Sequence, residues 1–142
     1  MVESFLANLA FWLYGLATLA MILMSLVYAT RRQIMPYHLK ALETSWEEID
    51  PKYQFMLKAL LNGGGYFGLC VGIFMLVVLL IPFRAGENWA GYAIGLIGLL
   101  GTLPLTMIVY RVKTQTAGNP PFSLMIIINA FLIIGLLAFI FG

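Results

Sequence analysis

Few side chains in this 142-residue sequence are of types that do chemistry, and most of them lie in one polar stretch, residues 31–58. The single histidine, His38, directly follows Tyr37. Four acidic residues come next: Glu43, Glu47, Glu48 and Asp50. A histidine in such a place can be an axial ligand, a proton donor to a quinone or a pH-sensitive group. The commoner role is an interfacial residue that pairs with Glu43 or a lipid phosphate, and we expect that role here.

Metal, redox and catalytic motifs are missing from the sequence. The one cysteine, Cys70, lies in an apolar run, so no intramolecular disulfide or CxxC pair can form. One histidine without a nearby cysteine does not make a closed metal site. No GxSxG, HExxH or phosphate-loop pattern occurs. We therefore expect no metal site, no cofactor and no enzymatic activity.

The composition is that of a membrane protein. Hydrophobic residues make up 62% of the sequence and charged residues 10%, whereas a soluble domain carries about 25% charged residues. Four uncharged runs are long enough to cross a ~30 Å hydrocarbon core as helices: residues 5–29, 59–81, 89–110 and 121–141. We predict an all-α fold, a single four-transmembrane-helix domain over residues 1–142 in contact with membrane lipids. The first run lacks the basic start and cleavage site of a signal peptide, so we expect a retained helix. The net charge of +2 is too small to indicate nucleic-acid binding.

Polar residues inside the runs are few and uncharged, which argues against proton pumps, ion-coupled transporters and voltage sensors. Asn129 is the most informative of them. It is expected to make an interhelical hydrogen bond worth about 1 kcal/mol, or alternatively to contact the head group of a lipid or quinone. Tyr37 and His38 are the other candidates for such a contact.

The connection between the first two runs has the features of a short amphipathic helix. Pro36 is a good first helical residue, and an apolar face repeats at Leu39, Leu42 and Trp46. Ser45 and Glu48 match the capping-box pattern. Asp50 followed by Pro51 then predicts the start of the second long helix, which Pro82 should end near Ile81.

Basic residues flank the runs unevenly. The first and third connections, with their flanks, contain seven: Arg31, Arg32, Lys40, Lys52, Lys58, Arg111 and Lys113. The second connection contains only Arg84. The positive-inside rule predicts that the first and third connections are cytoplasmic and that both termini lie outside.

Small residues recur every four positions in the second run, at Gly64, Gly68 and Gly72. On a helix they form a stripe without side chains, a glycine zipper that lets a second membrane helix approach closely. The third run offers a matching row at Gly91, Gly95 and Gly98. We predict that the second and third helices pack along these rows, with the first and fourth helices as alternative partners. Pro104 should kink the third helix.

Four short motifs support a resemblance. They are Met35-Pro-Tyr-His38, Trp46-Glu-Glu-Ile-Asp-Pro51, Leu60-Leu-Asn-Gly-Gly-Gly65 and Pro82-Phe-Arg-Ala-Gly-Glu-Asn-Trp-Ala90. Together they resemble a group of small bacterial membrane proteins with four predicted spans. The resemblance covers most of the chain and implies a bacterial cytoplasmic (inner) membrane. It implies no activity and no catalytic residues.

Two functions fit these observations. The first is a non-enzymatic accessory, assembly or structural subunit that binds another membrane protein or a second copy of itself. The alternative is a binder or carrier of an apolar small molecule, a lipid or a quinone. A flat exposed face of glycines or aromatics would favour the first. A pocket lined by Tyr66, Thr102, Thr106 and Asn129 would favour the second.

Overall fold

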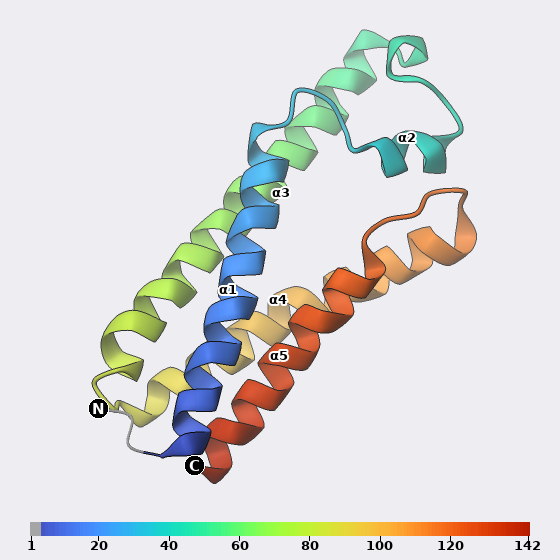
Figure 1. Ribbon diagram of the computed structural model, residues 1–142. Coiled ribbons are helices and arrows are strands. Elements are labelled where there is room, and N and C mark those ends of the chain that lie inside the picture. The colour runs from blue at the N-terminus through green and yellow to red at the C-terminus, as the bar shows by residue number, and fades with distance from the viewer. Residues whose placement is uncertain (1–3) are drawn as a thin grey trace.

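The computed structural model describes residues 4–142, which fold into helices without any strand (Figure 1). The elements are α1 (Phe5–Thr30), α2 (Pro36–Leu42), the 3-10 turn η1 (Trp46–Glu48), α3 (Pro51–Val78), the π-helical turn η2 (Leu79–Phe83), α4 (Asn88–Gln115) and α5 (Phe122–Phe141). Four helices of the described chain are long and apolar enough to cross a membrane: α1, α3 with η2, α4 and α5. The predicted all-α, multi-pass four-helix bundle is thereby confirmed.

Local signals in the sequence set the helix starts. The Ser4 hydroxyl accepts a hydrogen bond from the backbone N–H of Ala7 at 3.0 Å and caps α1. The Asp50 carboxylate accepts one from the N–H of Lys52 at 2.9 Å, so α3 begins at Pro51 as predicted. The short helix predicted at Pro36 also forms, as α2. These caps satisfy N–H groups that a helix start leaves without intrahelical partners.

The four long helices form two pairs that converge at one end and diverge at the other (Figure 1). α1 packs against both α3 and α5, and α4 packs against α5. α3 and α4 are joined by a short turn yet contact each other much less than α1 contacts α3. We call the end that holds the α3–α4 turn the narrow end. The wide end holds α2, η1 and the α4–α5 connection.

The glycine row of α3 packs against α1, so the prediction that it faces the third membrane helix was wrong. A Cβ atom added at Gly72 would lie 2.6 Å from Ile22 Cγ1, and one added at Gly68 would lie 2.5 Å from Ser25 Oγ. A Cβ atom added at Gly65 would lie 2.2 Å from the backbone nitrogen of Ala29. The backbones of α1 and α3 therefore touch near the wide end.

Gly64 does not belong to this row, because an added Cβ atom would meet nothing within 4 Å. The reason is helical geometry. Residues seven apart, such as Gly65 and Gly72, differ by only about 20° around a helix. At 3.6 residues per turn, Gly64 and Gly72 are eight apart and differ by about 80°. A four-residue spacing therefore drifts off the contact face, and Gly65 takes the place predicted for Gly64.

Three glycines of α4 pack against α5. A Cβ atom added at Gly95 would lie 2.9 Å from Leu136 Cδ1, and one added at Gly98 would lie 2.8 Å from Leu132 Cδ2. At Gly91 the nearest atoms belong to the Phe139 ring, at 2.6 Å. The two glycine rows thus serve two different interfaces, α1–α3 and α4–α5.

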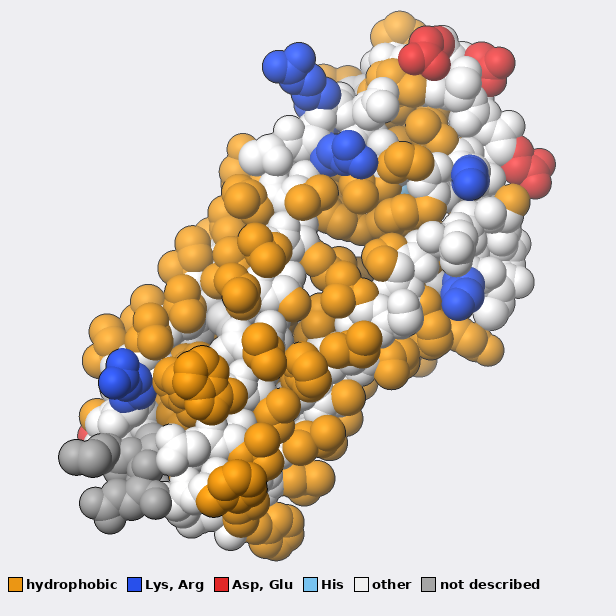
Figure 2. Space-filling view, viewed as in Figure 1, with side chains coloured by type: hydrophobic (Ala, Val, Ile, Leu, Met, Phe, Trp, Pro, Cys, Tyr) orange, Lys and Arg blue, Asp and Glu red, His pale blue; other side chains and the backbone are white. Residues whose placement is uncertain are grey.

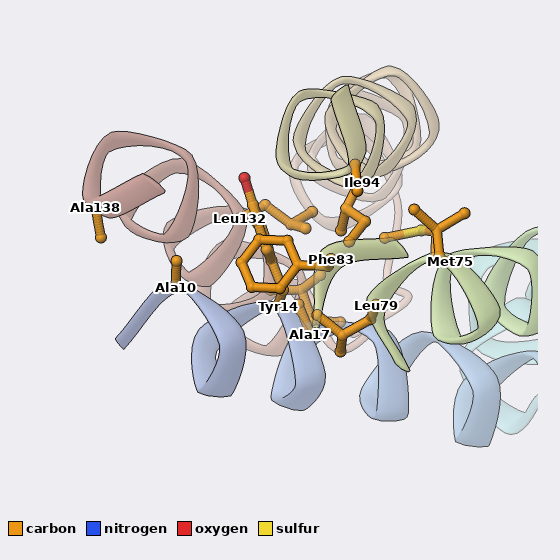
Figure 3. Close-up of a cluster of buried hydrophobic side chains, with 12 residues drawn as sticks. Ala10, Tyr14, Ala17, Met75, Leu79, Phe83, Ile94, Leu132 and Ala138 are labelled. Carbon is orange, nitrogen blue, oxygen red and sulfur yellow. The ribbon is translucent and has the colours of Figure 1, made fainter. Parts of the chain in front are cut away.

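The core of the narrow half is built around Tyr14 (Figure 3). Its side chain is 0% exposed, and its hydroxyl donates a hydrogen bond to the carbonyl oxygen of Gly91 at 3.0 Å. The Phe83 ring meets it edge-on, with the centroids 6.0 Å apart. Buried Leu132 and Ile94 complete the cluster. Tyr14 therefore ties α1 to the other three membrane helices at this end.

Candidate functional site

A cavity of about 530 Å³ opens where the two helix pairs diverge. All four membrane helices contribute to its walls, and the lining is almost entirely apolar. Representative wall residues are Met21 and Met24 of α1, Leu61 and Val71 of α3, Leu105 of α4 and Ile128 of α5. Figure 2 shows the molecule hollowed between the pairs, below α2.

Glycines make room for this cavity. Gly64 of α3 and Gly101 of α4 both line it, and a Cβ atom added at either would meet nothing within 4 Å. Gly64, which was predicted to pack against another helix, therefore lines the cavity instead. Pro104 lies on the same wall of α4, which stays helical from Asn88 to Gln115. The kink predicted there remains a prediction.

Asn129 joins α5 to α4. Its side-chain oxygen accepts a hydrogen bond from the Thr102 hydroxyl at 2.7 Å. Its amide nitrogen donates to the Thr106 hydroxyl at 2.7 Å and to the carbonyl oxygen of Met125 at 2.8 Å. The amide thus has protein partners for its donors and its acceptor, which is the interhelical bond that the sequence favoured. Of the four polar residues expected around a pocket only Thr102 lines this one, and Tyr66 is 58% exposed.

Two tyrosines mark the end of the cavity nearest α2, which we call its mouth. Tyr28, in the last turns of α1, lines the cavity, and its hydroxyl is hydrogen-bonded to the hydroxyl of Tyr37 in α2. α2 also reaches the α4–α5 connection, because a Cβ atom added at Gly118 would lie 2.7 Å from the carbonyl oxygen of Tyr37. The short amphipathic helix therefore spans the wide end from one helix pair to the other.

His38 lies beside this mouth. Its ring meets the Tyr37 ring edge-on at a centroid distance of 4.4 Å. Burial lowers the pKa of His38, which favours a neutral imidazole near pH 7. Within the described chain His38 makes no bond with Glu43, so the pairing expected between them does not form. No group of three or more His, Cys, Asp or Glu side chains with the spacing of a metal site occurs between residues 4 and 142.

Asn62 fixes the backbone at the mouth. Its side-chain amide donates to the carbonyl oxygens of Tyr28, Ala29 and Arg31, at 2.8, 3.1 and 3.1 Å. These carbonyl groups lie at the end of α1, where a helix has no further N–H groups to donate hydrogen bonds to them. In the sequence, Asn62 is one of the few uncharged polar residues inside the apolar run 59–81. The available signal was an asparagine just before a glycine triplet, but the carbonyl groups that it bonds lie more than 30 residues away in the sequence.

This arrangement is a mostly apolar space, with Ser25 and Thr102 among its few polar wall residues. The space is bounded by all four membrane helices, and the hydroxyls of Tyr28 and Tyr37 stand at its mouth. No protein-family model, curated protein or solved structure matches the chain.

Proposed function

We propose that this protein is a non-enzymatic membrane protein that holds the apolar chain of a lipid or quinone between its two helix pairs. The observation that carries the proposal is the 530 Å³ apolar cavity. Small-molecule sites are concave, mostly apolar and usually about 300–1,000 Å³ in volume, with a few polar groups that fix orientation. Both features are present here, because the lining is almost entirely apolar and two tyrosine hydroxyls stand at the mouth.

A second candidate is an accessory or assembly subunit, favoured by the outer face of α3. Tyr66 on this face is 58% exposed. A Cβ atom added at Gly63 would meet nothing within 4 Å. This face offers glycine and aromatic surface to another membrane protein or to a second copy of the chain.

Native mass spectrometry of the protein purified in mild detergent tests the proposal. We expect the wild-type chain to carry one lipid-like molecule. Leucines at both Gly64 and Gly101 should fill the cavity and reduce that molecule to background, because both positions face it. Gly63→Leu is the matched control, since Gly63 is on the same helix but outside the cavity lining. A wild-type chain without bound lipid, or a double variant that keeps it, would contradict the proposal. A co-purifying protein in its place would favour the subunit.

We further propose that the protein lies in a bacterial cytoplasmic membrane with both termini outside. The support is the charge asymmetry of the connections. In Figure 2 the Lys and Arg side chains gather mainly at the wide end. That end would then face the cytoplasm, and the mouth of the cavity would open at the cytoplasmic interface.

Thiol labelling in intact cells tests this orientation. In a Cys70→Ser background, Ala85→Cys should react with a membrane-impermeant thiol reagent, and Gln115→Cys should react only after permeabilisation. Both positions are exposed. Ala85 suits the purpose better than Gly86, whose φ of +83° disfavours a side chain. The reverse labelling pattern would overturn the orientation.

A further inference from the structure

We infer that the molecule held in the cavity is an amphiphile with an anionic head group, a carboxylate or phosphate, which binds Arg31 at the mouth. This inference rests on the proposed function and adds the chemical class of the ligand. It distinguishes a charged lipid from a quinone, whose head is neutral.

Three observations place Arg31 beside the mouth. It comes three residues after Tyr28, which lines the cavity. Its carbonyl oxygen is held by Asn62 at 3.1 Å, and its side-chain Nε donates to Met35 Sδ at 3.2 Å, just before α2. Arg31 is also close enough to Tyr37 for its positive charge to act on that phenol.

The guanidinium group has unused donors. An arginine side chain has five N–H donors, and sulfur is a weak acceptor for the one that Nε supplies. Within residues 4–142 no carboxylate pairs with Arg31. The residue is nevertheless half-buried. A partly buried cation without a carboxylate partner is best stabilised by an anion that forms charge-assisted, bidentate hydrogen bonds.

The two tyrosines supply a further donor. Two hydroxyls carry two hydrogens, and the bond between Tyr28 and Tyr37 uses one of them. Burial and the bond to Tyr28 raise the pKa of Tyr37, and the nearby positive charge of Arg31 opposes that rise. The Tyr37 phenol therefore remains protonated at neutral pH. One phenolic hydrogen and the guanidinium can then both donate to the same oxyanion.

The charge of the wide end agrees with an anionic ligand. Seven basic residues lie there: Arg31, Arg32, Lys40, Lys52, Lys58, Arg111 and Lys113. Four acidic residues lie there: Glu43, Glu47, Glu48 and Asp50. The Glu48 carboxylate is occupied, because it accepts hydrogen bonds from the Ser45 N–H and the Thr44 hydroxyl. The surplus of positive charge attracts anionic amphiphiles to this end of the bundle.

The test compares matched probes on the full-length, delipidated protein in detergent. Oleate and oleyl alcohol share one chain and differ in head-group charge, and oleoyl lysophosphatidate presents a phosphate on the same chain. We expect both anions to bind at least about tenfold more tightly than the alcohol, since charge-assisted hydrogen bonds are roughly twice as strong as neutral ones. Inorganic phosphate and acetate, which lack a chain, should not bind measurably. Tight binding of phosphate or acetate alone would identify a site for a free anion and overturn the assignment.

Arg31→Gln should remove the preference for the anions and leave the affinity for oleyl alcohol unchanged. Arg31→Lys should keep part of the preference. Arg32→Gln is the matched control, because Arg32 is adjacent and exposed, and it should behave as wild type. Equal wild-type affinities for oleate and oleyl alcohol would overturn the inference while the proposed function stands. If neither amphiphile binds, both this inference and the proposed function are overturned.

Discussion

Replacing Gly65 with alanine is expected to destabilise the folded protein by more than about 3 kcal/mol, beyond the usual cost of overpacking. The added Cβ atom would lie 2.2 Å from the backbone nitrogen and 2.7 Å from the Cα atom of Ala29. Backbone atoms of a continuous helix have no alternative rotamer, so α1 and α3 must move apart. That movement would also break the bonds of Asn62 to the end of α1.

Substitutions at two other glycines of α3 are the comparisons for Gly65→Ala. Gly63→Ala should be neutral or slightly stabilising, because an added Cβ atom meets nothing within 4 Å and alanine is the better helix former by about 1 kcal/mol. Gly68→Ala should be intermediate, since the atom it meets is the rotatable hydroxyl of Ser25. The midpoint of unfolding by a denaturing detergent measures all three variants. Equal midpoints for Gly65→Ala and Gly63→Ala would show that α1 and α3 do not touch as described.

Tyr14→Ala is expected to cost about 3–5 kcal/mol, as for other large aromatic truncations in a core. Tyr14 is fully buried, and it contacts Gly135 of α5 and Gly95 of α4, whose added Cβ atoms would lie 3.0 and 2.9 Å from it. Removing the ring leaves a void at the point where α1 meets the other membrane helices. The narrow end, which holds the two pairs together, would lose its main contact.

Tyr14→Phe separates the ring from its hydroxyl. It removes only the hydrogen bond to Gly91, and hydrogen bonds between membrane helices average about 0.6 kcal/mol. Tyr66→Ala is the control for aromatic truncation on an exposed surface, and it should change the unfolding midpoint little. Should Tyr14→Phe lose as much stability as Tyr14→Ala, the hydrogen bond and not the packing would be the main contribution. A Tyr14→Ala variant as stable as wild type would exclude Tyr14 as the centre of the core.

The membrane helices could be predicted from the sequence because the signals for them are local. An apolar run without charge predicts a span wherever it lies in the chain. Asp50 and Pro51 predict a helix start because the cap contacts a backbone group two residues away. The exact end of a helix was harder to predict than its start. The second membrane helix was expected to end near Ile81, but its last turn is the π-helical segment Leu79–Phe83, with Pro82 inside it.

The sequence therefore predicts the number of membrane helices, their approximate limits, the short helix between the first two, and the use of glycine for close packing. It does not predict which helices pack together, and that pairing is visible only in the folded structure. A small-residue row is complementary to any close helix, so it does not identify its partner. Gly65 lies on the contact face and Gly64 does not, because they differ from Gly72 by about 20° and about 80° around the helix. The cavity depends on the divergence of the helix pairs. At its mouth, Asn62 is hydrogen-bonded to carbonyl oxygens of residues more than 30 positions away in the sequence. Such contacts depend on the angles at which whole helices cross, and no local pattern of residues predicts those angles.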